Sequence, residues 1–436
     1  MKPFTSSVAS VTSSVARSLL LLSALLLLSG CDCRPDCAQS ALSCHSSEES
    51  IAITCSMNWM VVSHPDWVTV NPMSGTGSKE VAITKEANNT GQPRDGKIVI
   101  VADNGDKLII PVYQKADPIV YVVGFETNAA GYSVATLWKN GNKIALSDGV
   151  YCTVAHSVYV TQNGIEYAAG FEVNAEGHAA ATLWKNGTTI ALSSGPYNAE
   201  VFSVYVTSDG TEYAAGWRYN AMWKEVATIW KNGVEIALTD GTYDAETRSI
   251  YVTPDGTEYV TGFERNASGR TIAILWINGN RYELSDGTYS AETRSVYVTQ
   301  DGTKYVAGWE ANEEGLNTAV LWINGNKNEL LGGTNTHASS VYVTPNGTVY
   351  VAGYEVDPFW SGTAVLWING NRTILSEGTN AYPSSVCVTS NGTVYVAGSE
   401  FCESWNSAAI LWKNGNRIAL SDGTTPTKAH SVFVKE

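Results

Sequence analysis

The chain has 436 residues, and its formal net charge at pH 7 is -15. This acidic balance argues against nucleic acid as a partner, because nucleic-acid binding rewards basic surfaces. After removal of a leader, about 400 residues remain, which is enough for two domains, and no second hydrophobic segment is long enough to span a bilayer.

Residues 1–30 are predicted to be a lipoprotein signal peptide. Lys2 and Arg17 precede the apolar run Leu19–Leu28, which is too short to be a membrane span. The run ends in Leu-Ser-Gly-Cys, a sequence that resembles the lipobox of bacterial lipoproteins. The resemblance implies that Cys31 is diacylated on sulfur and acylated on its new amino terminus, and three acyl chains make a stable anchor. The alternative is an ordinary secretory cleavage site with a chance cysteine.

Residues 31–47 are predicted to be a tether that contains cysteines. Four cysteines cluster in or just after it: Cys33, Cys37, Cys44 and Cys55. Disulfides in an oxidising envelope are one interpretation, and a zinc site is the other. Because the spacings lack the paired C-x-x-C knuckles of structural zinc sites, we predict no metal.

Residues 48–116 are predicted to form a small immunoglobulin-like β-sandwich, because strand-like runs alternate with Pro, Gly and Asn signals. The segment resembles the BACON domain family of Bacteroidetes envelope proteins at these positions: Asn58-Trp59, Asp66-Trp67-Val68, Pro72, Ser74-Gly75, Gly77, Asn88 to Thr90, Arg94, Gly96 and Tyr113-Gln114. The resemblance implies a Bacteroidetes lipoprotein whose module stands beside carbohydrate-active or mucin-associated domains. A module that only spaces another domain from the membrane is the alternative, with Trp59 and Trp67 as core residues.

Residues 117–436 are predicted to be one repeated all-β unit. Seven tryptophans recur 45 or 46 residues apart: Trp138, Trp184, Trp230, Trp276, Trp322, Trp367 and Trp412. A period in the forties that is built of short strands predicts a seven-bladed β-propeller. We interpret the repeated tryptophans as wedges between neighbouring sheets rather than as a binding site.

Each repeat is predicted to contain four strands, with an SVYV-like strand innermost, then a YVAG-like strand, the Trp strand and a KIALS-like strand. Asn-Gly and Asp-Gly supply the positive φ angles that the tight turns need. The first YVVG strand, Tyr121–Gly124, has no SVYV strand before it, and the last such strand, Ser431–Val434, stands at the C-terminus. We therefore expect the C-terminal strand to close the propeller and to remove both free edges.

The loops between the second and third strands are predicted to carry the binding site, because they vary while the turns on the opposite face barely change. Four repeats place a glycine in this loop, seven residues before the repeat Trp, whereas three place a tryptophan there. Tryptophan sacrifices a favoured turn residue, and exposed aromatic rings are suited to stacking on sugars and to protein hot spots. The candidate ligand-binding residues are Trp217, Tyr219, Trp223, Trp309, Phe359, Trp360 and Trp405. Packing of these rings over the rim is the alternative.

A column of carboxylates stands at the end of the second strand: Glu126, Glu172, Glu264, Glu310, Glu355 and Glu400, with Arg218 in the third repeat. Glycoside hydrolysis needs two carboxylates at a defined separation in one cleft, and a symmetric ring singles out no pair. Bonding to neighbouring backbone is the alternative for this column. No metal-ligand spacing, phosphate-binding loop or nucleophile elbow is found in the sequence, so we predict no catalytic residue and no cofactor.

These observations predict a lipid-anchored outer-membrane protein of the cell envelope, with its periplasmic or surface orientation left open. Glycan or mucin-type carbohydrate is the expected ligand of the variable propeller face. A protein-interaction scaffold in an envelope complex is the alternative, and a glycan-cleaving enzyme that uses the Glu column is a third hypothesis.

Overall fold

The computed structural model describes residues 42–46, 49–88, 90, 92–359, 361–376, 380–402 and 406–436. Every helix or strand assigned in these ranges is a strand, which confirms the all-β prediction. No helix that could cross a membrane is found among these residues. The chain divides into two compact units between Asp117 and Pro118, and each is described by itself.

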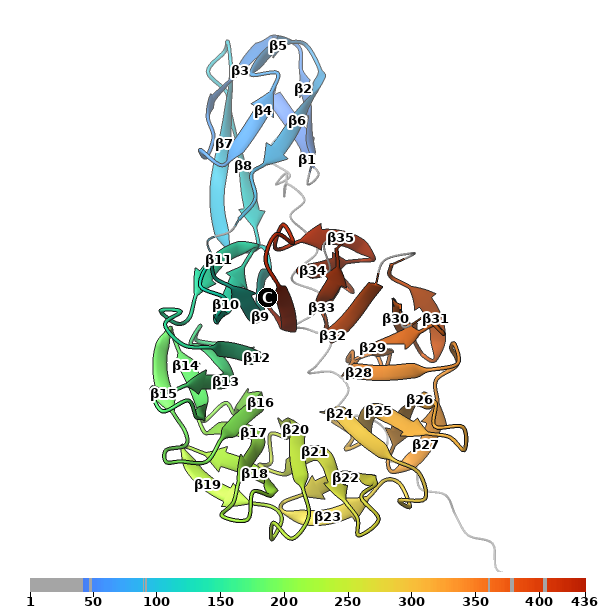
Figure 1. Ribbon diagram of the computed structural model, residues 1–436. Helices are drawn as coiled ribbons and strands as arrows, with labels where there is room; N and C mark the ends of the chain where they lie inside the picture. Colours follow the sequence, from blue (N-terminus) through green and yellow to red (C-terminus); the bar gives the residue numbers. More distant parts are fainter. Residues whose placement is uncertain are drawn as a thin grey trace, which may run out of the picture. The chain divides into compact units, whose positions relative to one another are not determined.

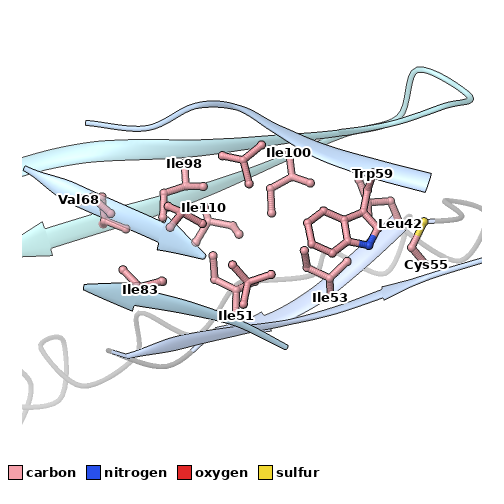
Figure 2. Packing of buried hydrophobic residues seen from close by; sticks show 14 of the residues in the cluster. Leu42, Ile51, Ile53, Cys55, Trp59, Val68, Ile83, Ile98, Ile100 and Ile110 are labelled. Atoms are coloured by element: carbon pink, nitrogen blue, oxygen red, sulfur yellow. The ribbon is translucent and has the colours of Figure 1, made fainter. Parts of the chain in front are cut away.

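The part of the first unit that the structure describes contains two four-stranded sheets, with strand orders β1-β2-β6-β4 and β5-β3-β7-β8. The strands are β1 (Leu42–Ser46), β2 (Ser50–Cys55), β3 (Asn58–Ser63), β4 (Val68–Asn71), β5 (Ser74–Thr76), β6 (Lys79–Lys85), β7 (Arg94–Ala102) and β8 (Lys107–Gln114). Alternate residues of these strands are buried, as expected for sheets with one face toward a core. Figure 2 shows Ile51, Ile53, Ile98, Ile100 and Trp59 pointing into the space between the strands.

Several residues of the predicted BACON resemblance have structural roles in this unit. The Trp59 ring is buried, and its Nε1–H donates to the Gly77 carbonyl oxygen at 2.9 Å. A Cβ atom at Gly75 would lie 2.9 Å from Cε2 of that ring, so a larger residue would displace the tryptophan. The Arg94 guanidinium lies 4.6 Å from the centre of the Trp67 ring. These contacts agree with the interpretation of Trp59 and Trp67 as packing residues.

The described residues of the second unit form seven four-stranded antiparallel sheets. The innermost strands are β12 (Thr153–Val160), β16 (Ala199–Val206), β20 (Ala245–Val252), β24 (Ala291–Val298), β28 (Thr336–Val343), β32 (Asn380–Val388) and β36 (Thr427–Lys435). The second strands are β9 (Ile119–Thr127), β13 (Glu166–Val173), β17 (Glu212–Tyr219), β21 (Glu258–Arg265), β25 (Lys304–Ala311), β29 (Val349–Val356) and β33 (Val394–Phe401).

The third and fourth strands complete each sheet toward the outside. The third strands are β10 (Ser133–Lys139), β14 (Ala179–Lys185), β18 (Glu225–Lys231), β22 (Thr271–Ile277), β26 (Asn317–Ile323), β30 (Gly362–Ile368) and β34 (Ser407–Lys413). The outermost strands are β11 (Asn142–Ala145), β15 (Thr188–Ala191), β19 (Val234–Ala237), β23 (Asn280–Glu283), β27 (Asn326–Glu329), β31 (Asn371–Ile374) and β35 (Asn416–Ala419). Figure 1 shows the sheets of this unit arranged radially, so the unit is propeller-like.

One sheet combines strands from the two ends of the second unit. Its strand order is β11-β10-β9-β36, and β36 pairs with β9 from Thr427 opposite Glu126 to Lys435 opposite Ile119. The repeated tryptophans are buried between the sheets, which confirms their interpretation as structural wedges.

Each innermost strand carries a β-bulge, which places one extra residue opposite its neighbour. In β16 the register shifts between Val201 and Ser203, so Phe202 is the extra residue. The facing glycine in β17 is Gly216, and a Cβ atom there would overlap the carbonyl oxygen of Glu200. The repeated glycine is therefore required by the close approach of the bulged backbone.

A serine in each innermost strand ties that strand to the next one. Its hydroxyl oxygen accepts a backbone N–H from the following innermost strand, as in the 3.1 Å bond from Val204 N–H to Ser157 Oγ. The same bond links β36 to β12, because Val158 N–H donates to Ser431 Oγ at 3.3 Å. The serine of the SVYV run thus has a structural function that its sequence pattern alone did not reveal.

Candidate functional site

Three of the predicted ligand-binding residues come together on the sheet formed by β16 to β19. Trp217 and Tyr219 are two residues apart in β17, so their side chains leave the same face of the strand, and their ring centroids are 4.8 Å apart. Trp223, in the loop between β17 and β18, lies 5.8 Å from the Tyr219 ring. Tyr197, in the segment before β16, lies 5.7 Å from Trp223. We call Tyr197, Trp217, Tyr219 and Trp223 the aromatic cluster.

Tyr197 was missed by the sequence prediction. It lies in the segment that crosses from one sheet to the next, a segment expected on the same face as the variable loops. Similar positions in other repeats also hold tyrosine, for example Tyr243 and Tyr289, which made it look like an ordinary repeat residue. Only its contact with Trp223 distinguishes it.

The loop that carries Trp223 is a tight turn with an unfavourable residue. Asn220 Oδ1 accepts the N–H groups of Met222 at 2.9 Å and Lys224 at 3.1 Å, and Trp223 N–H donates to the Asn220 carbonyl at 3.0 Å. This turn holds Trp223 at a φ of 58°, and the glycine at the equivalent position of a neighbouring repeat, Gly177, has a φ of 85°. A left-handed conformation costs a residue with a Cβ atom about 1–2 kcal/mol.

The Trp223 side chain does not recover this cost by burial. It is 62% exposed, and the preceding Met222 is 68% exposed. The alternative in which this tryptophan packs down over the rim is therefore not what the structure shows at this position. A large apolar ring held in solvent by a strained turn is a feature typical of binding surfaces.

Three carboxylates of β18, β20 and the segment before β20 lie near Tyr219 of the aromatic cluster: Glu225, Glu246 and Asp244. Glu225 is the cross-strand neighbour of Tyr219. Burial raises the pKa of the Tyr219 hydroxyl, and the nearby carboxylates of Glu225, Asp244 and Glu246 raise it further. Glu246 is only 8% exposed, and burial raises its pKa to about 7, although the Arg248 guanidinium opposes the shift.

Glu225 on β18 and Glu246 on β20 are neighbouring acidic side chains. Burial is the main cause that raises the pKa of Glu225, and the nearby Asp244 carboxylate raises it further. Arg248 Nη2 lies 2.7 Å from Glu246 Oε2, so a guanidinium partly compensates the buried carboxylate.

The Glu column of the second strands forms ion pairs with the outermost strands. Glu126 pairs with Lys143 at 2.6 Å, and Glu355 pairs with Arg372 at 2.5 Å. The same spacing of 17 residues joins these further pairs: Glu264 with Arg281, Glu310 with Lys327 and Glu400 with Arg417. The alternative in which these carboxylates bond mainly to neighbouring backbone is wrong, because their partners are side chains.

The third repeat has the same ion pair with its charges exchanged. Arg218 Nε lies 2.5 Å from Glu235 Oε1, so the apparent break in the Glu column preserves the interaction. In the second repeat, Thr189 stands 17 residues after Glu172, where other repeats have the basic partner, and burial raises the pKa of Glu172. No group of three or more His, Cys, Asp or Glu side chains in the described ranges could hold a metal ion.

The other predicted ligand-binding residues do not join the aromatic cluster. The ring centroids of Trp309 and His337 are 5.7 Å apart, and those of the stacked His337 and Tyr354 rings are 4.7 Å apart. Trp309 therefore belongs to a separate row of half-buried rings. Phe359 is 89% exposed. Trp360 and Trp405 lie outside the residues that the structure describes, as does the predicted acylation site Cys31.

Comparison with known proteins identifies the N-terminal segment. Residues 46–115 match the family model BACON, described as "Putative binding domain, N-terminal". The N-terminal segment is thus similar to BACON domains. This agrees with the resemblance predicted from the sequence. No curated protein matches the chain.

Solved structures resemble the chain only distantly. The WD40 β-propeller domain of Doa1 has 16% identity and a TM-score of 0.42, with 64% of this chain and 86% of that chain covered. TolB from Acinetobacter baumannii has 12% identity and a TM-score of 0.40, with 65% of this chain and 76% of that chain covered. An auxiliary nutrient binding protein from Bacteroides ovatus has 10% identity and a TM-score of 0.31, with 69% of this chain and 91% of that chain covered.

Proposed function

We propose that the protein is a lipid-anchored outer-membrane protein that binds glycan through the aromatic cluster. In this proposal, residues 1–30 are removed as a signal peptide, and a tether acylated on Cys31 leads to β1. The predicted tether of residues 31–47 is too long, because Leu42–Ser46 form β1 and pair with β2 in the first unit. The BACON-like module extends to residue 116, and residues 117–436 are a seven-bladed β-propeller closed by β36. The BACON match, with its description as a binding domain, supports a generic binding role.

The single observation that carries glycan binding is Trp223. The Trp223 ring is exposed, and the residue has an unfavourable positive φ in its turn. The ring makes edge contacts with the rings of Tyr197 and Tyr219. Flat aromatic faces stack on the apolar C–H faces of sugar rings, while nearby carboxyl groups can bond to sugar hydroxyls. Glu225 and Glu246 supply such groups near Tyr219.

Closure by β36 is supported by its pairing with β9 and by the bond from Val158 N–H to Ser431 Oγ. The pairing gives the first sheet its fourth strand, and a closed ring would hold the variable loops rigidly. We propose a binding role rather than catalysis for this face, because most of the Glu column is engaged in ion pairs with the outermost strands.

The test is a glycan array probed with the protein purified from membranes in detergent. Wild type, Trp223→Ala and Tyr282→Ala should be compared, since Tyr282 is an exposed aromatic residue on β23 and serves as a matched control. We expect selective binding that Trp223→Ala reduces at least about tenfold, by loss of a hot-spot residue, and that Tyr282→Ala retains. Binding unchanged in Trp223→Ala would refute the assignment of this cluster.

A protein-interaction scaffold is the second candidate, favoured by the exposed Met222 beside Trp223. Methionine and tryptophan are enriched at protein interfaces. Crosslinking in the native membrane followed by purification should then yield a stoichiometric partner that Trp223→Ala loses. Absence of such a partner, together with glycan binding, would exclude this alternative.

The membrane anchor has its own test. Replacement of Cys31 by Ala should abolish metabolic labelling with a radioactive fatty acid and release the protein from the membrane fraction. A Cys33→Ala variant is the matched control, because it removes a nearby cysteine and keeps the lipobox. Labelling that persists in Cys31→Ala would refute acylation at this residue.

A further inference from the structure

The column of carboxylates on the second strands has one member whose basic partner is replaced. In other repeats the partner stands 17 residues later on the outermost strand, in these pairs: Glu126 with Lys143, Glu264 with Arg281, Glu310 with Lys327, Glu355 with Arg372 and Glu400 with Arg417. The third repeat keeps the pair with exchanged charges. In the second repeat the two positions hold Glu172 and Thr189, so a neutral residue stands where the cation is expected.

The Glu172 carboxylate has an oxygen atom that is buried without a donor. Its Oε2 atom is inaccessible to solvent and accepts no hydrogen bond from the residues that the structure describes. Burial raises the pKa of this carboxyl, and the nearby Asp148 carboxylate raises it further, as expected for a carboxylate without a counter-charge. A buried acceptor without a hydrogen bond is costly, and a ligand that donates to it would remove that cost.

Asp148 brings a second carboxylate to this place from the segment before β12. Its counterparts in two other repeats are Asp286, which interacts electrostatically with Lys327, and Asp422, which interacts with Lys143. In those two sheets a lysine therefore stands between an aspartate and a glutamate. The second repeat keeps both carboxylates and has no lysine at the equivalent position.

The fifth repeat shows how much room this place provides. A hollow of about 310 Å³ lies there, and its lining includes Thr318, Lys327 and Glu329. The second repeat has a smaller residue at each of these three positions: Ala180, Thr189 and Ala191. Because Thr189 is exposed on β15, a ligand can reach the place from solvent.

The lysine of the first repeat shows which ligand shape fits. Lys143 pairs across strands with the repeated tryptophan of its sheet, and its Nζ atom reaches Glu126 Oε2 at 2.6 Å. Thr189 pairs with the repeated tryptophan of the second repeat in the same register. An unbranched alkyl stem that lies over Thr189 therefore brings an ammonium to Glu172 along the path of a lysine side chain.

We propose that Glu172, with Asp148 beside it, binds the primary ammonium group of a ligand that has an unbranched alkyl stem. The ammonium donates to Glu172 Oε2 in a charge-assisted hydrogen bond and takes the place of the lysine that other repeats supply. A free diamine and a lysine side chain of a polypeptide present this same group. The site belongs to a different sheet from the aromatic cluster and does not depend on glycan binding.

The experiment is equilibrium dialysis of the detergent-solubilised protein against radiolabelled cadaverine, at an ionic strength of about 0.15 M that screens exposed charges. We expect the wild type to bind a single saturable equivalent. Thr189→Lys supplies the cation from the chain itself and should weaken this binding at least about tenfold, because a hydrogen bond to a charged group is worth that much. Thr189→Ser is the matched control and should bind as the wild type does.

A second variant tests the argument from the repeats. Lys143→Thr gives the first sheet the same residues as the second at this pair of positions, since Glu126 then loses its partner. This variant should bind a second saturable equivalent of cadaverine. Glu172→Gln should lose the equivalent that the wild type binds. A Lys143→Thr variant that binds no additional amine would contradict the inference.

The remaining outcomes also decide the inference. Equal binding by the wild type and Thr189→Lys would overturn it, as would no saturable binding of either cadaverine or tetralysine. Binding of tetralysine alone, lost in Thr189→Lys, would support it and identify a polypeptide as the source of the amine. If Glu172→Gln does not fold, Thr189→Lys still decides, because Thr189 is exposed and lysine occupies its position in two other sheets. Trp223→Ala should retain amine binding, so failure of the proposed glycan binding is distinguishable.

Discussion

The turn at Trp223 should store backbone strain, and paired substitutions can show this. Trp223→Ala and Trp223→Gly remove the same indole ring and its edge contacts with Tyr197 and Tyr219. They differ in one respect, because only glycine adopts a φ of 58° without steric cost. The difference in unfolding free energy between the two variants therefore isolates the backbone strain at this position.

The expected magnitudes follow from the geometry of the loop. Relief of a left-handed conformation is worth about 1 kcal/mol when Ala is replaced by Gly. Loss of the ring removes two aromatic contacts worth about 1 kcal/mol each at most, because the side chain is largely in solvent. We therefore expect Trp223→Ala to be about 1 kcal/mol less stable than wild type and Trp223→Gly to be close to wild type, while both lose ligand binding.

Urea unfolding followed by intrinsic fluorescence measures these differences, and Gly177→Ala provides the reverse control. Gly177 occupies the equivalent position of the preceding repeat at a φ of 85°, and an added Cβ atom there would have no heavy atom within 4 Å. Its substitution should cost about 1 kcal/mol through backbone strain alone. Equal stability of Trp223→Ala and Trp223→Gly would refute the reasoning, and a neutral Gly177→Ala would show that these turns relax at no cost.

Three further predictions concern stability. Gly216→Ala should destabilise the second unit by about 2 kcal/mol or more in urea unfolding, because its Cβ atom would overlap the Glu200 carbonyl; unchanged stability would contradict the bulge in β16. Deletion of residues 427–436 removes the partner of β9 and should make the whole second unit sensitive to protease, whereas a resistant fragment would argue against closure. Burial raises the pKa of Glu246 from 4.5 to about 7, so the folded state holds this proton more tightly than the unfolded state does. Stability should therefore fall as pH rises from 4.5 to 7, by about 3 kcal/mol at most, and a pH profile unchanged in Glu246→Gln would refute the shift.

The period, the strand order and the exposed tryptophan could be predicted from the sequence because each is a local property. Alternating apolar residues, Asn-Gly turns and the repeated tryptophans act over a few residues or recur at a constant spacing. Trp223 was recognisable because it replaces a glycine in a turn that requires a positive φ. In the first unit, the same local signals predicted the sandwich and its buried Trp59.

The partners of these residues could not be predicted, because they depend on how separate strands align and pack. Arg218 looked like an irregularity until its ion pair with Glu235, two strands away, showed the same interaction with exchanged charges. The role of the Gly216 column depended on a bulge in the neighbouring strand.

By itself, the sequence determined an all-β chain with a BACON-like segment, a repeat of four strands and a candidate aromatic face, since hydrophobic periodicity and turn chemistry are written into consecutive residues. Only the tertiary structure decided which groups meet. It brought Tyr197, which precedes β16, to Trp223, which follows β17, and it placed Glu246 of one sheet near Glu225 of another. The physical reason is that ring contacts, ion pairs and burial depend on distances of a few ångströms between residues that are about twenty or more positions apart in the chain.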